Sequence, residues 1–255
     1  MKTTVTLEVD GVLGRMTLRP DPETKPNTLD LDVLSTMDEL LDTVAGNTEL
    51  RVLLVESASP KYFVVGANIK ALQDIDVQSI HPWIHRGHEV FGRFQKLDIP
   101  AIAVVRGYAY GGGLELALAC DMIYASEDAR FALPEAGLGF VPGWGGTQRL
   151  PRRIGAPRAK RMIFTGRPVS ASEAESLGLI AFRGDDEALD TELAATVEAI
   201  AKNSRISVGM CKQLINGAFE SPESTRAFEE AAASSVCLSD GDTQRRLRDF
   251  FDQRT

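Results

Sequence analysis

The sequence predicts an α/β fold with an α-helical C-terminal region. Up to about residue 150, short apolar runs of strand length alternate with segments whose apolar residues recur at helical spacing. From about residue 155 onward, helical patterns dominate. The chain has 255 residues, of which 44% are hydrophobic and 25% are charged. It can therefore bury a sizeable core, as one large domain or as a core domain with a smaller appendage.

The N-terminal part of the chain predicts a hairpin, a loop, a helix and a strand. Apolar and polar residues alternate on both sides of Asp10-Gly11, which indicates a β-hairpin with a tight turn. Three prolines within residues 19–29 predict a stiff, extended loop. Apolar residues at helical spacing predict a helix over residues 30–46. The continuous apolar run of residues 50–57 predicts a buried parallel strand.

The middle of the chain continues this alternation, and helices follow it. Amphipathic or apolar patterns predict helices over residues 81–97 and 114–120. Apolar runs predict strands over residues 100–107 and 121–126, and a short strand with a turn over residues 130–137. The C-terminal helical segments cover residues 156–166, 170–178, 188–203, 206–219 and 225–238.

Charge, cysteines and hydropathy exclude several classes of protein. A net charge of −8 disfavours a general surface for nucleic acid or anionic membrane. The three cysteines are odd in number and far apart, as is typical of a reduced intracellular protein. The N-terminus carries no signal or transit pattern, and no apolar run approaches the roughly 20 residues of a membrane span. We expect a cytoplasmic protein that binds neither nucleic acid nor membrane.

Three consecutive glycines, Gly111–Gly113, precede the apolar segment that contains Glu115. They match neither the dinucleotide fingerprint nor the P-loop, because the third glycine and the lysine of those motifs are missing. Glycines after a strand allow a sharp turn, and amides at a helix start can face a developing anion. The alternative is a tight strand–helix turn without a ligand. A second small turn at Gly66-Ala67 could supply another amide, and two amides that face one oxygen form an oxyanion hole.

Two glutamates are candidate acid–base groups. Glu115 falls in the first turn of the predicted helix, where it could simply cap that helix. Its apolar neighbours also favour desolvation, which raises a carboxyl pKa and suits acid–base chemistry. Glu135 follows a proline in an apolar, glycine-rich stretch, and it could equally be a surface turn residue. The spacing of the two glutamates alone does not bring them together.

Three histidines, His81, His85 and His88, share helical spacing, so a metal site is conceivable. No cysteine or obvious acidic ligand nearby completes such a site. A solvated or pocket-lining helix face is the better interpretation, and we expect no metal.

These motifs resemble the crotonase superfamily, and the enoyl-CoA hydratases within it most closely. The blocks that carry the resemblance follow the order and spacing of that family, and together with the hairpin and the helical C-terminus they cover nearly the whole chain. They are YFVVGANIK, PAIAVVRGYAYGGGLELALACDMIYAS, ARFALPEAGLGFVPGWGGTQRLPRRIG and TGRPVSASEAESLGLI.

The resemblance implies a crotonase-like superhelix of ββα units followed by an α-helical region. It implies a core domain with the CoA-ester site over residues 1–195 and an oligomerisation region over residues 196–255. Family members are typically trimers or dimers of trimers, so a homotrimer or a dimer of trimers is expected here. They bind acyl-CoA thioesters and need no metal or redox cofactor, since coenzyme A is part of the substrate.

By motif position, the resemblance also implies the site residues. The amides that hold the thioester oxygen fall on Ala67 and Gly112, and the two catalytic carboxylates fall on Glu115 and Glu135. The CoA ester is expected to contact Gly112 and the segment Ala67, Asn68, Ile69 and Lys70. The implied reaction is reversible syn addition of water to a 2-enoyl-CoA, giving a 3-hydroxyacyl-CoA. Glu115 would deprotonate the water and Glu135 would protonate C2.

Four residues depart from the family pattern. Asn68 replaces the usual Asp, Val64 and Val65 replace small residues, and Trp144 replaces a frequent small residue. These departures leave the preferred acyl chain open. A Δ3,Δ2-enoyl-CoA isomerase or another crotonase-type reaction is the alternative activity. A non-catalytic or RNA-associated module is a third hypothesis, against which the net charge and the complete pair of glutamates argue.

Overall fold

Two β-sheets form the body of the protein in the computed structural model, which describes residues 2–68, 73, 75–220 and 222–252. The larger sheet has the order β1-β2-β3-β5-β7-β10 and is parallel apart from the β1–β2 hairpin. Its strands are β1 (Lys2–Asp10), β2 (Leu13–Asp21), β3 (Val52–Ser57), β5 (Ala101–Val105), β7 (Met122–Ser126) and β10 (Phe182–Gly184). The smaller sheet contains β4 (Tyr62–Val64), β6 (Tyr108–Tyr110), β8 (Arg130–Ala132) and β9 (Val169–Ser170).

The chain alternates between the two sheets, which produces the superhelix expected from the sequence. In each successive pair, β3–β4, β5–β6 and β7–β8, the first strand joins the larger sheet and the second joins the smaller one. Helix α3 (Ile80–Lys96) follows the first pair, and α4 (Gly112–Ala119) follows the second. The ββα repeat therefore brings the segments that follow β4, β6 and β8 to one end of the smaller sheet.

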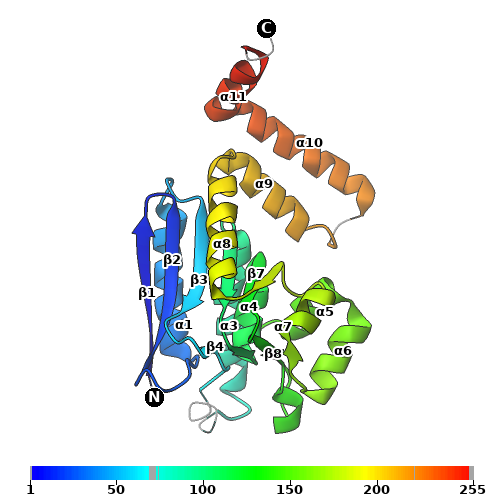
Figure 1. Ribbon diagram of the computed structural model, residues 1–255. Helices are drawn as coiled ribbons and strands as arrows, with labels where there is room; N and C mark the ends of the chain where they lie inside the picture. Colours follow the sequence, from blue (N-terminus) through cyan, green and yellow to red (C-terminus); the bar gives the residue numbers. More distant parts are fainter. Residues whose placement is uncertain (1, 69–72, 74, 221, 253–255) are drawn as a thin grey trace.

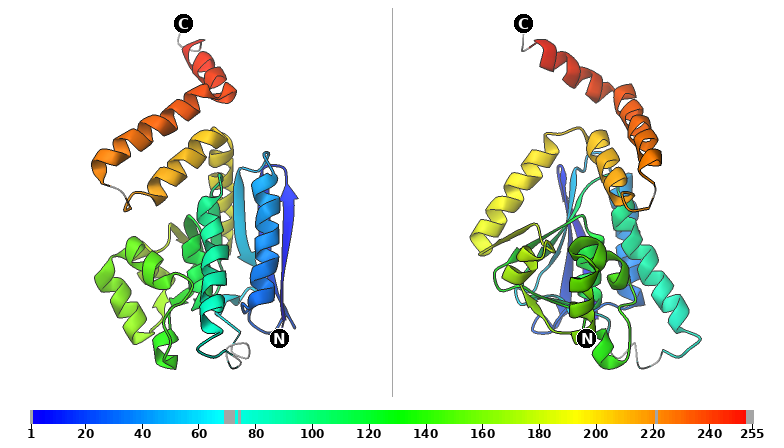
Figure 2. Two further views of the ribbon diagram at one scale, coloured as in Figure 1. Left: turned by 180° about the vertical axis from the view of Figure 1, so that it is seen from behind. Right: turned by 90° about the vertical axis from the view of Figure 1, so that its right-hand side faces the viewer.

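Apolar side chains of β3 point alternately to two hydrophobic clusters, as expected for a strand covered on both faces. Leu53 and Val55 face the main core, against which α1 (Leu31–Gly46) and α3 pack. Val52 and Leu54 face a second cluster, to which α8 (Asp186–Ala201) contributes Leu189 and Leu193. Figure 2 shows α8 on one side of the larger sheet and α1 and α3 on the other.

Most helices lie where the sequence predicts them, and the hairpin, the buried strands and the helix over residues 31–46 are confirmed. The C-terminal half adds elements that the helical patterns did not reveal. Helix α5 contains Pro151, and the strands β9 and β10 are too short to produce a pattern of their own. The other helices within the described ranges are η1 (Glu135–Leu138), α5 (Gly146–Ile154), α6 (Ala156–Thr165), α7 (Ala171–Ser176), α9 (Arg205–Asn216), α10 (Glu223–Ser239) and α11 (Gly241–Asp252).

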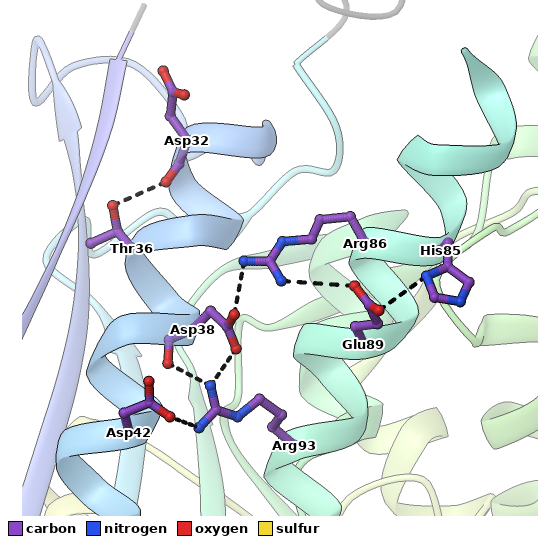
Figure 3. A network of polar contacts seen from close by, with 8 residues as sticks. All are labelled: Asp32, Thr36, Asp38, Asp42, His85, Arg86, Glu89 and Arg93. Carbon is purple, nitrogen blue, oxygen red and sulfur yellow. Dashed lines mark hydrogen bonds and ion pairs between the residues drawn. The ribbon is translucent and has the colours of Figure 1, made fainter. Parts of the chain in front are cut away.

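A network of charged side chains ties α1 to α3 (Figure 3). Asp38 of α1 accepts from both Arg86, at 2.8 Å, and Arg93, and Arg93 also pairs with Asp42. Partial burial opposes the charge on Asp38, but the hydrogen bonds from Arg93 and Arg86 outweigh it and lower the pKa of this carboxyl. On α3, Glu89 pairs with Arg86 and His85. The network holds the outer side of α3, whose inner side lines the cavity described below.

The C-terminal helices extend away from the sheets. Figure 1 shows α10 and α11 beyond α9, at the end of the molecule opposite the N-terminus. Neither α10 nor α11 contains a buried residue. Residue 195, where the predicted core domain ends, lies inside α8, which packs on the larger sheet.

Helix α9 is attached to the core by a buried lysine. Lys212 is 7% exposed, and its Nζ donates to the carbonyl oxygens of Phe94 and Ile99 at 2.7 and 2.9 Å. The same Nζ lies 2.9 Å from Oδ2 of Asp121, which also accepts from the amide of Ala101. The ammonium group thus joins α9 to the end of α3 and to the start of β5.

We expect Lys212→Met to lower the free energy of unfolding by about 2–3 kcal/mol, because Asp121 and two carbonyl groups lose their donor. Urea denaturation of the purified variant measures this change. The matched control is Lys202→Met, whose ion pair with Glu198 lies at the surface and should contribute little. Equal stability of the two variants would contradict an anchoring role for Lys212.

Candidate active site

A cavity of about 230 Å³ opens between α3, the glycine turn before α4 and the segment from Pro134 to Trp144. Its exposed rim carries Leu138 and Phe140, and its buried end carries Trp83 and Trp144. The other lining residues are Val65, Gly66, Ala67, Ile80, Ile84, Gly111, Gly112, Glu115, Pro134, Glu135, Val141 and Gly143. Two carboxyl groups therefore lie in an otherwise mainly apolar pocket.

The three glycines form a turn in which the backbone conformation at Gly111 and the close packing at Gly113 disfavour a side chain. Gly111 has a φ of +53°, which disfavours other residues, and its amide donates to Ala132 O at 2.9 Å. A Cβ on Gly113 would lie 2.0 Å from the carbonyl oxygen of Val64. Gly112 is the first residue of α4, so its amide has no partner within that helix. Gly112 itself lines the cavity.

The turn at Gly66-Ala67 lies against the glycine turn. Leu29 pairs with Ala67 in a parallel bridge, in which Leu29 N donates to Gly66 O at 2.9 Å and Asn68 N donates to Leu29 O at 2.7 Å. In such a bridge, the N–H of the central residue, here Ala67, points away from its partner strand. A Cβ on Gly66 would lie 3.5 Å from Gly112 N, so the two turns are in contact.

Glu115 does not cap its own helix but reaches the start of α5. Its side chain is 2% exposed, and its Oε1 accepts from the amides of Trp144 and Gly146, both at 2.8 Å. Burial raises the pKa of Glu115 to about 7, against the effect of the hydrogen bond from Gly146, and the charge of Glu135 raises it further. The carboxyl is therefore fixed in place and titrates near neutral pH.

Glu135 has the opposite surroundings. It begins η1 directly after Pro134, and its Oε2 is buried without a hydrogen-bond partner among the described residues. Burial raises the pKa of this carboxyl, and a backbone hydrogen bond partly offsets the effect. Its Oε1 lies 3.0 Å from the position that a Cβ on Gly111 would take. The Glu135 side chain thus lies against the glycine turn, and its Oε2 lacks a hydrogen bond within the described ranges. Glu135 is therefore not a surface turn residue.

The sequence-predicted site residues are largely brought together. Ala67, Gly112, Glu115 and Glu135 line the cavity, and Asn68 continues the chain beside Ala67. Ile69 and Lys70 lie outside the described residues.

Two histidines of the predicted histidine face of α3 have different partners. His85 pairs with Glu89 at 3.2 Å, whereas His88 reaches the carbonyl of Gly143. Burial lowers the pKa of His88, and the charge of Arg149 lowers it further. No group of three or more potential metal ligands occurs within the described ranges.

Sequence reasoning did not identify three residues that shape the site. Arg149 donates from Nη1 to Trp144 O at 2.7 Å, and its charge lowers the pKa of Glu115. Trp83 and Gly87 lie one turn apart on α3, and both contact Trp144. Their spacing on the apolar face of the helix was the available signal, but it does not distinguish a pocket wall from the core.

Three further properties bear on the expected class of protein. The three cysteines, Cys120, Cys211 and Cys237, are free. In the part of the chain that the structure describes, no helix has both the length and the hydrophobicity of a membrane span. The exposed apolar residues of the C-terminal helices include Ile215, Phe228 and Val236.

Comparisons with known proteins agree with this geometry. Residues 10–255 match the profile of the family described as enoyl-CoA hydratase/isomerase. The chain is 34% identical to the short-chain-enoyl-CoA hydratase of Clostridium acetobutylicum, over 98% of this chain and 95% of that protein. It is 31% identical to the crotonyl-CoA hydratase of Syntrophomonas wolfei, over 89% and 88% of the two chains.

Solved structures match the whole fold. An enoyl-CoA hydratase from Bacillus anthracis superimposes with a TM-score of 0.91 at 30% identity, over 98% of this chain and 96% of that chain. A Geobacillus kaustophilus structure with a similar description superimposes with a TM-score of 0.94 at 26% identity, over 100% and 96%. The predicted crotonase-like superhelix with a helical C-terminal region is thereby confirmed. With a family match over nearly its full length and these relatives, the chain belongs to the enoyl-CoA hydratase/isomerase family of the crotonase superfamily.

Proposed function

We propose that this protein is an enoyl-CoA hydratase, a hydro-lyase that reversibly adds water across the 2,3 double bond of a 2-enoyl-CoA thioester. The observation that carries the proposal is the pair of glutamates in one apolar cavity, which is also lined by two backbone turns that contact each other. The names of the relatives, which are hydratases of short-chain or crotonyl-CoA substrates, support the same reaction.

The two turns are proposed to stabilise the enolate that forms during the addition. When water attacks C3, negative charge develops on the thioester oxygen. The amides of Ala67 and Gly112 lie on turns that contact each other, so they can face one oxygen from two sides. A preorganised donor of this kind contributes roughly 3–4 kcal/mol to transition-state stabilisation. The CoA chain is proposed to extend from this point along Asn68, Ile69 and Lys70.

The surroundings of the two carboxyl groups support different roles. Glu115 accepts two amide hydrogen bonds, which stabilise its ionised form, so it is proposed to take a proton from the attacking water. Glu135 has a buried oxygen without a partner, which disfavours its ionised form, so it is proposed to give a proton to C2. The hydroxide adds to C3, and the pair of carboxyls carries one proton before and after the reaction.

The proton of the pair also explains reversibility. Burial and the neighbouring charge raise the pKa of Glu115 to about 7, and burial also raises the pKa of Glu135, so either carboxyl can carry the shared proton. The form with the proton on Glu115 is the acid needed for dehydration, whereas the form with the proton on Glu135 is the acid needed for hydration. Because the two groups are coupled, they titrate as a pair, and transfer through a cavity water interconverts the two forms.

Purified protein should deplete crotonyl-CoA, measured as loss of the conjugated-thioester absorbance. No turnover of crotonyl-CoA or of any longer or aromatic enoyl-CoA would overturn the proposal. The relatives do not favour the isomerase alternative. Isomerisation needs one base and no water, so isomerisation of a 3-enoyl-CoA that persists in Glu115→Gln would reinstate it.

Three further properties are part of the proposal. We expect turnover without an added cofactor, because coenzyme A enters as part of the substrate; dialysis against a chelator should leave the rate unchanged.

A homotrimer or a dimer of trimers is proposed, with residues 196–255 as the oligomerisation region, because α10 and α11 expose apolar side chains such as Phe228. Light scattering would test the mass. Three free cysteines fit a cytoplasmic location.

A further inference from the structure

Trp144 forms the buried end of the cavity. Its side chain is 3% exposed, and its Nε1 donates to the carbonyl oxygen of Trp83 at 3.2 Å. The ring packs against Trp83 at a centroid distance of 5.3 Å and meets Phe91 edge-on at 5.7 Å. One hydrogen bond and two aromatic neighbours therefore hold the indole in a single orientation.

Glycines on two helices make room for this indole. A Cβ on Gly87 of α3 would lie 2.1 Å from Cδ1 of Trp144, which is far inside van der Waals contact. A Cβ on Gly112 of α4 would lie 2.9 Å from Cε3 and Cζ3 of the same ring. The indole thus fills the space between α3 and α4 and abuts the residue whose amide is proposed to hold the thioester oxygen.

This position places the ring where an acyl chain has to go. The thioester carbon lies next to Gly112 in the proposed function, and the acyl chain extends from it into the apolar cavity. Among the lining residues, Leu138, Phe140 and Val141 are at least half exposed, as residues at an opening are, whereas Trp144 and Trp83 are buried, as residues at a closed end are. The cavity of about 230 Å³ is below the range of about 300–1,000 Å³ that is usual for small-molecule sites. It suits a few carbons and not a long chain.

We propose that Trp144, seated against Gly87, sets an upper limit on acyl-chain length and restricts this enzyme to short 2-enoyl-CoA substrates. This inference rests on the proposed function for the reaction but concerns a different property, the depth of the acyl pocket. The contact of Trp144 with Glu115 is made by its backbone, because the amide of Trp144 donates to Oε1 of Glu115. The side chain can therefore be changed while this amide remains.

The test compares kcat/KM for crotonyl-CoA and octenoyl-CoA in the full-length protein. A single methylene in a hydrophobic pocket changes kcat/KM by about 10- to 200-fold, so the wild type should prefer crotonyl-CoA by at least about 10-fold. Trp144→Ala should raise kcat/KM for octenoyl-CoA by at least about 10-fold and reduce or invert the preference. Trp144→Leu, a smaller change, covers the case in which the alanine variant does not fold.

Two further variants separate pocket depth from general loss of packing. Phe94→Ala removes a fully buried aromatic ring of α3 that does not line the cavity, so it should destabilise the protein without changing the preference. Gly87→Ala should displace the indole and lower crotonyl-CoA turnover. Because the clash is with Trp144, the same change in the Trp144→Ala background should have little further effect.

Binding provides a readout that is independent of turnover. In calorimetric titrations, the wild type should bind butyryl-CoA more tightly than octanoyl-CoA. Trp144→Ala should lose this difference in affinity. Selective binding of butyryl-CoA without hydration of any substrate would overturn the proposed function and support the chain-length limit. Equal use of both enoyl-CoA substrates by the wild type, or an unchanged preference in Trp144→Ala and Trp144→Leu, would overturn the limit.

Discussion

Replacing Glu135 with glutamine is expected to lower kcat for crotonyl-CoA hydration by about 10²- to 10⁴-fold and to leave the fold intact. The loss follows from the loss of general acid catalysis, because a carboxamide cannot deliver a proton to C2. The fold should persist because Oε2 of Glu135 has no hydrogen-bond partner in the described structure, so the substitution breaks none there. Unfolding should occur at the same temperature or a slightly higher one.

Two measurements separate a proton donor from a residue that only shapes the turn. Exchange of the C2 proton of butyryl-CoA with deuterated solvent should vanish in Glu135→Gln, since it needs this base and no water addition. A residue with a structural role alone would change stability and not exchange. Asp128→Asn removes an exposed acid from the turn that precedes β8 and should match the wild type. Normal exchange and turnover in Glu135→Gln would refute its role.

The fold was largely predictable because its signals are local. Continuous apolar runs mark β3, β5 and β7, and these strands are covered on both faces, as such runs require. The paired turns were also predictable, since glycines that follow a strand have few other uses. The smaller sheet was predicted only at β8, because β4, β6 and β9 have two or three residues each and are defined by their partners. No periodicity emerges from segments of that length.

The site was predictable in its residue types but not in its contacts. Local sequence could assign Glu115 only to the start of its own helix. The structure instead directs its side chain to the amides of Trp144 and Gly146, which are 29 and 31 residues away. The contact of Trp144 with Gly87 is also long-range, since it joins two segments 57 residues apart that touch only in the folded chain. Contacts of this kind depend on the path of the superhelix.

Both carboxyl groups are arranged at a cost to stability. A buried oxygen without a partner on Glu135 and a buried, titrating carboxyl on Glu115 each disfavour the folded state relative to neutral replacements. Natural proteins retain such features where function requires them. The site should therefore show a trade-off in which neutral variants lose activity and gain stability.

Glu115→Gln is the variant in which this trade-off should depend on pH. The pKa of Glu115 is about 7 in the folded protein, whereas the ordinary pKa of a glutamate carboxyl is 4.5. Between these values the folded state binds more protons than the unfolded state, so the wild type loses stability as pH rises from 4.5 through 7. Glutamine does not titrate, and its oxygen can still accept from the amides of Trp144 and Gly146. The variant should therefore gain stability relative to the wild type by about 2–3 kcal/mol between pH 5 and pH 8.

Urea denaturation of both proteins at pH 5 and pH 8 measures this gain, and Glu39→Gln, which removes the same charge from an exposed position on α1, controls for net charge. Hydration by Glu115→Gln should fall by about 10²- to 10⁴-fold at both pH values, since no base remains for the water. Exchange of the C2 proton, which uses Glu135, should persist. A stability difference that does not change with pH would contradict the raised pKa, and loss of exchange together with hydration would contradict the division of roles between the two glutamates.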